Sequence, residues 1–180
     1  NWGHTHESFE EPIVVQHIWG ALQWLASGRP QDYTKKLRSE LPPEENRFTK
    51  VILDRNLDEP TELAVTDGGK IFFGERKGKL KMYDPKKGKT KVVADLDVFS
   101  KFEYGLMGVN IDPDYNNNHW LYLFYSPQTG KADTAQHLSR FTYDDVKDTL
   151  LMDTEKVLLR VPVKRDGCCH TGGSIAWDKS

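Results

Sequence analysis

The segment 168–174, with sequence CCHTGGS, contains the residues most suited to chemistry. A histidine such as His170 titrates near neutral pH, and in a glycine-rich loop at the start of a strand it can face a cleft and act as a general base. A surface or hydrogen-bonded loop histidine is the structural alternative, which the local sequence alone favours. A zinc site is not expected, because the adjacent Cys168 and Cys169 rarely both fit one tetrahedral ion and no second Cys or His pair stands nearby.

The segment 103–108, EYGLMG, is the second candidate. Gly105 and Gly108 bracket a tight entry into a predicted strand, and Glu103 precedes that strand on a loop. Taken alone, Glu103 is best interpreted as a solvated carboxylate beside a structural glycine turn.

Two other groups of polar residues have metal-ligand chemistry but incomplete ligand sets. His4 and His6 would share one face of a strand, yet only Glu7 could join them, so we interpret them as solvated loop residues. The acidic and amide residues between 112 and 118 resemble a calcium loop in composition but lack its terminal Glu, and therefore predict a turn. We predict no metal ligands within this chain.

The composition narrows the class of protein. The chain has 180 residues, a formal net charge of -2 and 11% aromatic residues. These values argue against a disordered chain and against a nucleic-acid-binding protein. No apolar run reaches the roughly 18 residues that a membrane span needs. Because the chain starts at Asn1 without Met and stops just after a predicted strand, we expect it to be a piece of a longer protein.

The elements that position these residues fall into two parts. Residues 1–28 predict one amphipathic helix, with Pro12 in its first turn and Gly28 after its end. Its apolar residues recur at helical spacing: Val14, Ile18, Ala21, Leu22 and Leu25. Residues 29–46, rich in proline and charge, predict a linker and domain boundary with a short helix over 33–41.

From residue 47 onward the pattern changes to short β-rich runs separated by turn residues. Strands are predicted over 48–53, 62–66, 70–75, 79–83, 91–94, 106–111, 120–126, 137–143, 156–162 and 174–177. A weak repeat of strand, Asp-containing turn and aromatic strand occurs at 62–75 and 107–126 and begins again at 172–180. This repeat favours the first blades of a β-propeller over a β-sandwich.

Several ordered motifs in this second part resemble one family. They are RFTK at 47–50, LDEP at 57–60, ELAV at 62–65, GERKGKL at 74–80, GLMG at 105–108, DPDY at 112–115, HWLY at 119–122, LSRF at 138–141 and CHTGGS at 169–174. Together they are similar to the N-terminal part of the soluble quinoprotein glucose/sorbosone dehydrogenases. The resemblance covers about residues 47–180.

This resemblance implies a fold, a cofactor and a chemistry. The fold is an all-β six-bladed propeller, and the cofactors are pyrroloquinoline quinone and calcium, whose binding residues are expected beyond Ser180. His170 takes the place of the base that removes the proton from a sugar hydroxyl while hydride passes to the quinone. Glu103 falls where glucose-oxidising members carry an amide near the substrate. Glu103 and Cys169 both depart from those members, so the sugar preference stays open.

The resemblance also implies partners and a location. They are a sugar or polyol substrate, an electron acceptor such as a cytochrome c domain, and a periplasmic or secreted protein. Residues 1–28 resemble a different family, on GHT at 3–5, ESF at 7–9 and IWGALQW at 18–24. They are similar to the C-terminal end of a ThuA-like, trehalose-utilisation domain with an α/β flavodoxin-like fold.

Three functional hypotheses follow. The first is a quinone-dependent sugar or alcohol dehydrogenase. The second is a non-catalytic propeller that binds carbohydrate or protein, because a fold does not fix a function. The third makes the ThuA-like part the active domain and the propeller a carbohydrate-targeting device.

Overall fold

The computed structural model describes residues 12–27, 49–129, 134–167 and 171–178. Contacts divide the chain into two units, residues 1–50 and 51–180. The predicted linker 29–46, the short helix 33–41, His4, His6 and the loop residues Cys168, Cys169 and His170 lie outside the described residues.

The first unit contributes one helix, α1 (Pro12–Ala26). It begins at the proline that the sequence places in the first turn, so the predicted helix is confirmed. Several of its large apolar side chains are exposed, among them Ile13, Trp19 and Leu22. Within the described ranges, neither α1 nor the four-residue α2 is long and apolar enough to cross a membrane.

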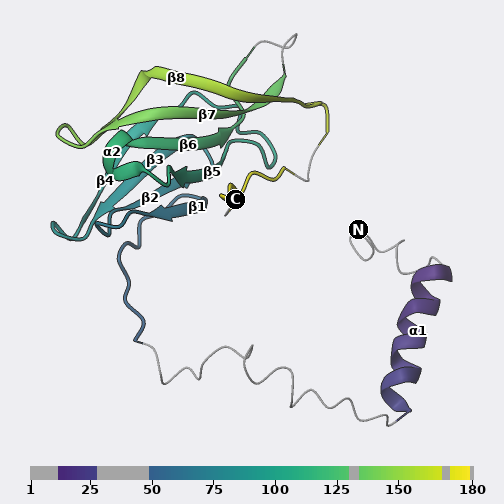
Figure 1. The fold of residues 1–180 in the computed structure, drawn as a ribbon. Helices are drawn as coiled ribbons and strands as arrows, with labels where there is room; N and C mark the ends of the chain where they lie inside the picture. The colour runs from purple at the N-terminus through teal and green to yellow at the C-terminus, as the bar shows by residue number, and fades with distance from the viewer. Residues whose placement is uncertain (1–11, 28–48, 130–133, 168–170, 179–180) are drawn as a thin grey trace. The chain divides into compact units, whose positions relative to one another are not determined.

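The second unit contains two four-stranded antiparallel sheets, each formed by consecutive strands (Figure 1). The first sheet has the order β1 (Pro60–Val65), β2 (Ile71–Glu75), β3 (Lys79–Asp84) and β4 (Lys89–Asp95). The second has the order β5 (Leu106–Ile111), β6 (Trp120–Tyr125), β7 (Ala135–Asp144) and β8 (Thr149–Pro162). A single helical turn, α2 (Tyr115–Asn118), lies between β5 and β6.

The two sheets pack against each other through their apolar faces. β1 and β2 contact β5, and β4 contacts β8. At the centre the Phe72 ring lies edge-on to the Tyr143 ring, with 4.8 Å between centroids. The fully buried side chains of this core come from both sheets: Phe72, Leu80, Met82, Leu106, Val109, Leu121, Leu123, Phe141 and Tyr143. Consecutive meander sheets packed face to face are the arrangement of successive propeller blades, which confirms the predicted fold class.

The loops that carry the candidate residues leave the sheets at one end. Because neighbouring strands run in opposite directions, the turn 76–78, the loop 96–105, residues 126–129 and residues 163–167 emerge together. Hydrogen bonds join them: Leu106 N–H donates to the Arg76 carbonyl (2.8 Å), and Phe99 N–H donates to the Ser126 carbonyl (2.8 Å). We call this the site end of the sheets.

Eight of the ten predicted strands are confirmed and two are wrong. The structure has no strand over residues 49–53 or over 174–177. In the described part of the chain, neither segment forms a ladder of backbone hydrogen bonds with a strand. A strand is defined by its ladder of backbone hydrogen bonds, so an apolar run without a partner remains irregular.

Candidate functional site

Glu103 lies on the loop that leads into β5, and it contacts the segment that follows His170. The backbone N–H of Thr171 donates to Glu103 Oε2 at 3.4 Å. Thr171 is the next residue after His170, so the structure brings Glu103 to the described segment that follows the second candidate. The position of His170 itself lies outside the described residues.

The loop that carries Glu103 is held by an arginine from the first sheet. Arg76, in the turn after β2, donates from Nη1 to the carbonyl oxygens of Ser100 (2.6 Å) and Tyr104 (2.9 Å). The backbone conformation of Gly105 completes the contact. Its φ is +145°, and a Cβ at this position would lie 1.9 Å from the Arg76 carbonyl oxygen. Only glycine fits this approach.

The residues before His170 are tied to the same loop. The Tyr104 hydroxyl donates to the Lys164 carbonyl at 2.7 Å. The Arg165 guanidinium donates to the carbonyls of Pro127 (2.9 Å) and Ala135 (3.1 Å), and it stacks over the Phe99 ring. The segment 163–167 is therefore anchored to the neighbouring loops.

The residues after His170 run beside β5 (Figure 1). Asn110 Nδ2 donates to the Ile175 carbonyl at 2.7 Å, and Trp177 Nε1 donates to the Ile111 carbonyl at 2.7 Å. The backbones approach so closely that a Cβ on Gly108 would lie 2.0 Å from the Gly173 carbonyl oxygen. The described segments on the two sides of residues 168–170 are thus both anchored to neighbouring elements.

A second carboxylate reaches this segment from the first sheet. The Ser174 hydroxyl donates to Glu62 Oε1 at 2.7 Å. The other carboxylate oxygen, Glu62 Oε2, is buried without a hydrogen-bond partner in the described part of the chain. Ser174 and Glu62 therefore join the segment 171–178 to β1.

Residues 112–118 form a turn that ends in the single helical turn α2, so the predicted turn is confirmed. The Asp112 carboxylate accepts hydrogen bonds from Asn118 Nδ2 (2.8 Å), Asp114 N–H (2.9 Å) and the Tyr122 hydroxyl (2.8 Å). Burial would raise the pKa of Asp112, but these hydrogen bonds outweigh it and lower the pKa below the ordinary value. Within the described ranges no group of three or more His, Cys, Asp or Glu side chains could hold a metal ion.

The described residues also do not complete a quinone site. The two arginines at the site end, Arg76 and Arg165, donate to backbone carbonyls of the surrounding loops. The hydrogen bonds of these two guanidinium groups that the structure describes thus hold the protein's own loops.

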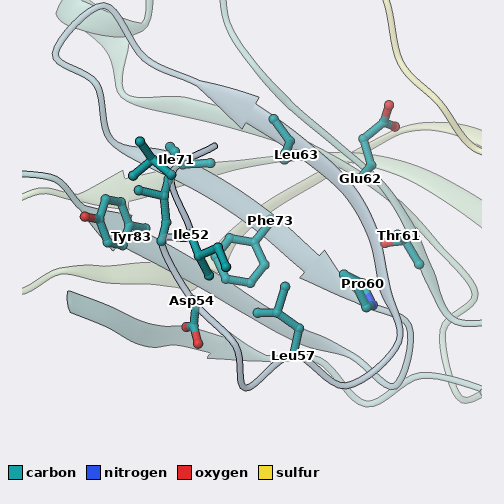
Figure 2. A pocket seen from close by; sticks show the side chains of 12 residues that line it. Ile52, Asp54, Leu57, Pro60, Thr61, Glu62, Leu63, Ile71, Phe73 and Tyr83 are labelled. Atoms are coloured by element: carbon teal, nitrogen blue, oxygen red, sulfur yellow. The ribbon is translucent and has the colours of Figure 1, made fainter. Parts of the chain in front are cut away.

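An apolar groove of about 540 Å³ lies on the first sheet, away from these loops. Figure 2 shows Ile52 and Leu57 beside Phe73, while Glu62 points away from them. The segment 51–57, predicted in part as a strand, forms one wall of this groove. Its lining is mostly apolar, and it contains neither candidate residue.

Comparison with known proteins identifies the family. The model of the family described as "Glucose / Sorbosone dehydrogenase" matches residues 57–180. This is more than half of the chain, and the chain belongs to that family.

One curated relative and several solved structures are similar to the chain. Quinoprotein glucose dehydrogenase B of Acinetobacter calcoaceticus is 29% identical over 140 residues, which are 73% of this chain and 28% of that protein. The PQQ-bound form of aldose sugar dehydrogenase from Streptomyces coelicolor has a TM-score of 0.56 and 25% identity, over 66% of this chain and 34% of that one. The apo soluble aldose sugar dehydrogenase of Escherichia coli has a TM-score of 0.56 and 23% identity, over 67% and 35%. The chain thus spans about a third or less of these relatives.

Sequence reasoning found the two loops but missed the residues that hold them. Arg76 and Tyr104 lie within the quoted motifs GERKGKL and EYGLMG, yet their types alone give no sign of which carbonyls they bind. The glycines at 105 and 108 gave the one usable signal, because each marks a close backbone approach.

Proposed function

We propose that this chain forms the first blades of a quinone-dependent sugar dehydrogenase in which His170 is the general base. The observation that carries the proposal is the contact between Glu103 Oε2 and the N–H of Thr171, within a loop anchored on both sides. Membership in the glucose/sorbosone dehydrogenase family supports the reaction class.

In the proposed reaction, His170 accepts the proton of a sugar or polyol hydroxyl. Pyrroloquinoline quinone, when bound, would supply the redox chemistry by accepting the hydride from the same carbon, and residues outside this chain would hold it with calcium. Glu103, on the neighbouring loop that leads into β5, binds a substrate hydroxyl. The anchored loops keep the base at a fixed distance from that hydroxyl.

The proposal extends to the wider protein. A cytochrome c domain or similar acceptor reoxidises the quinone, and the protein is periplasmic or secreted. Residues 1–28 end a ThuA-like domain that precedes the propeller. None of these features is needed for the test of His170.

A non-catalytic binding propeller is the second candidate function. A fold does not fix a function, and in the described part of the site end Arg76 and Arg165 donate to backbone carbonyls of the surrounding loops. In this case the site end would bind carbohydrate or protein without oxidising it.

The test compares wild-type protein with His170→Asn after reconstitution with quinone and calcium, by dye-linked oxidation over a panel of sugars and polyols. Asparagine keeps much of the side-chain volume but cannot accept the proton at neutral pH, so turnover should fall roughly 10²–10⁴-fold while quinone binding survives. The matched control is His119→Asn. His119 lies at the opposite end of the sheets with φ 55°, a conformation that asparagine adopts readily.

Three outcomes separate the hypotheses. Activity in the wild type and the control, with loss in His170→Asn, supports the base. An unchanged rate in His170→Asn makes His170 a structural loop residue. If wild-type protein neither binds quinone nor oxidises any sugar, the binding propeller takes its place.

A further inference from the structure

Arg76 belongs to the first blade, yet most of its side-chain hydrogen bonds are made to the loop of the second blade that carries Glu103. We propose that Arg76 is a positioning residue, which sets the loop 99–105, and with it the Glu103 carboxylate, against the segment that follows His170. The inference rests on the proposed function for its catalytic consequence. Its structural part stands on the geometry alone.

The guanidinium and the backbone of Arg76 both bind this loop. One nitrogen, Nη1, donates to the carbonyl oxygens of Ser100 and Tyr104, which flank Glu103 on both sides. The carbonyl of Arg76 accepts the N–H of Leu106, the first residue of β5. Hydrogen bonds to this single residue of the first blade therefore hold the loop from Ser100 to the start of β5.

The loop conformation needs an external support. Phe102 has φ 56°, in the left-handed region that bulky residues rarely adopt, and its side chain is about half exposed. Such a conformation persists only where the surrounding contacts determine it. Closest to Phe102 the structure supplies the two Arg76 hydrogen bonds and one backbone hydrogen bond, from Tyr104 N–H to the Lys101 carbonyl. Hydrogen bonds with Ser126 and Lys164 hold the two ends of the loop.

Arg76 is itself oriented by a carboxylate. Its Nε forms an ion pair with Glu59 Oε2, and its backbone N–H donates to the Glu59 carbonyl at 3.0 Å. The guanidinium therefore serves three acceptors with a fixed planar arrangement of donors. Lysine cannot reproduce this arrangement, because its ammonium is a single point on a flexible stem.

The neighbouring Lys77 provides a matched comparison. It forms ion pairs with Asp58 (3.0 Å) and Glu59 (3.1 Å) but makes no hydrogen bond or ion pair to the loop 99–105 in the described part of the chain. A change at Lys77 removes a cation beside the same Glu59 without touching the loop. The comparison therefore separates loop positioning from local charge.

The position of Glu103 follows from this support. Glu103 lies between the two carbonyls that Arg76 holds, and its Oε2 accepts the N–H of Thr171. Without Arg76 the loop loses both restraints, and the carboxylate moves relative to the His170 loop. A displacement of about 1 Å at a reacting site can cost as much as 100-fold in rate.

The experiment uses the complete protein with Arg76→Ala, Arg76→Lys and Lys77→Ala. Backbone hydrogen exchange is followed in peptides covering 99–106 and 163–175, and kcat and KM are measured with the best sugar of the panel. In Arg76→Ala we expect exchange about tenfold faster in 99–106 and kcat lower by about 10- to 100-fold. Arg76→Lys should have an exchange rate and a kcat between those of wild type and Arg76→Ala, and Lys77→Ala should match wild type in both. Added guanidinium ion should partly restore kcat in Arg76→Ala.

The outcomes are distinguishable from failure of the proposed function. Unchanged exchange in 99–106 in Arg76→Ala overturns the positioning role, whatever the activity. Faster exchange with unchanged kcat and KM overturns the catalytic consequence and leaves Arg76 a structural residue. If wild-type protein oxidises no sugar, the proposed function fails, and the exchange of Arg76→Ala against Lys77→Ala still decides the positioning of the loop. If Arg76→Ala does not fold, hydrogen exchange and kcat of Arg76→Lys, measured without added guanidinium ion, decide whether Arg76 positions the loop.

Discussion

The hydroxyl of Tyr104 donates a hydrogen bond of 2.7 Å to the carbonyl of Lys164, sixty residues later in the chain. Tyr104 follows Glu103 directly, and Lys164 belongs to the segment that leads to His170. One side chain therefore connects the two loops on which the proposed chemistry depends. The Tyr104 ring is 7% exposed and lies edge-on to Phe99, so its hydroxyl has a fixed direction.

Tyr104→Phe should loosen the segment before His170 while it keeps the ring packing. The loss of one hydrogen bond should lower the free energy of unfolding by about 1 kcal/mol and speed hydrogen exchange in 163–167. Tyr83→Phe is the control, because the Tyr83 hydroxyl makes no hydrogen bond within the described part of the first sheet. Equal exchange in the two variants would show that the Tyr104 hydroxyl does not hold the segment.

Gly108→Ala should separate the segment 171–178 from β5. The added Cβ would lie 2.0 Å from the Gly173 carbonyl oxygen, which is a backbone atom and cannot rotate away. We expect loss of the proposed activity and faster exchange over 171–178. Gly68→Ala is the control, since its Cβ would meet only Thr66 Oγ1 at 3.8 Å. Wild-type activity in Gly108→Ala would contradict the close packing of these two segments.

The sequence predicted those parts of the fold that depend on local patterns. The strands from β1 to β8 follow from alternating apolar residues and turn residues, and the tight approaches at Gly105 and Gly108 follow from glycine at a strand entry. Glu103 and the segment after His170 were found as separate motifs. Their contact could not be predicted, because it depends on how two successive blades bring distant loops to one end.

The failures share a physical cause. Residues 49–53 have strand-like residues but no pairing strand among the described residues, and they line the groove on the first sheet instead. Arg76 could not be assigned a role because its acceptors are backbone carbonyls of another blade, which carry no residue-type signal. The sequence pattern of a segment predicts its own secondary structure but not which other segments it contacts.

Lys81→Met should destabilise the first blade strongly. Lys81 Nζ lies 2.6 Å from Glu75 Oε1, and the Glu75 side chain is 3% exposed. Without the Lys81 ammonium, the buried Glu75 carboxylate keeps the Asp58 N–H as its one hydrogen-bond donor in the described part of the chain. The free energy of unfolding should therefore fall by about 3 kcal/mol. The double variant Glu75→Leu/Lys81→Met should recover most of this loss in urea unfolding. Equal stability of the single variant and wild type would mean that the pair is open to water.

The last prediction concerns acid stability at the opposite end of the sheets, where Lys87 joins the two blades. Lys87 Nζ lies 3.0 Å from Asp148 Oδ2 and 3.3 Å from Asp84 Oδ2. The hydrogen bond from Lys87 lowers the pKa of Asp148 below its ordinary value of 3.8. A lowered carboxyl pKa in the folded state means that the contribution to stability is present above pH 3.8 and is lost as the pH falls through the folded-state pKa.

Lys87→Met should therefore lower the free energy of unfolding at pH 7. The difference in this free energy between the variant and wild type should become smaller below about pH 4. The difference at pH 7 should be small, because the Lys87 side chain is 61% exposed and water screens the pair. Urea unfolding at pH 7 and at about pH 3 measures both values. Lys86→Met, in the same turn but without an ion pair to the described residues, should behave as wild type at both. A difference between Lys87→Met and wild type that stays constant over this range would show that the Asp148 carboxylate does not carry the contribution of Lys87.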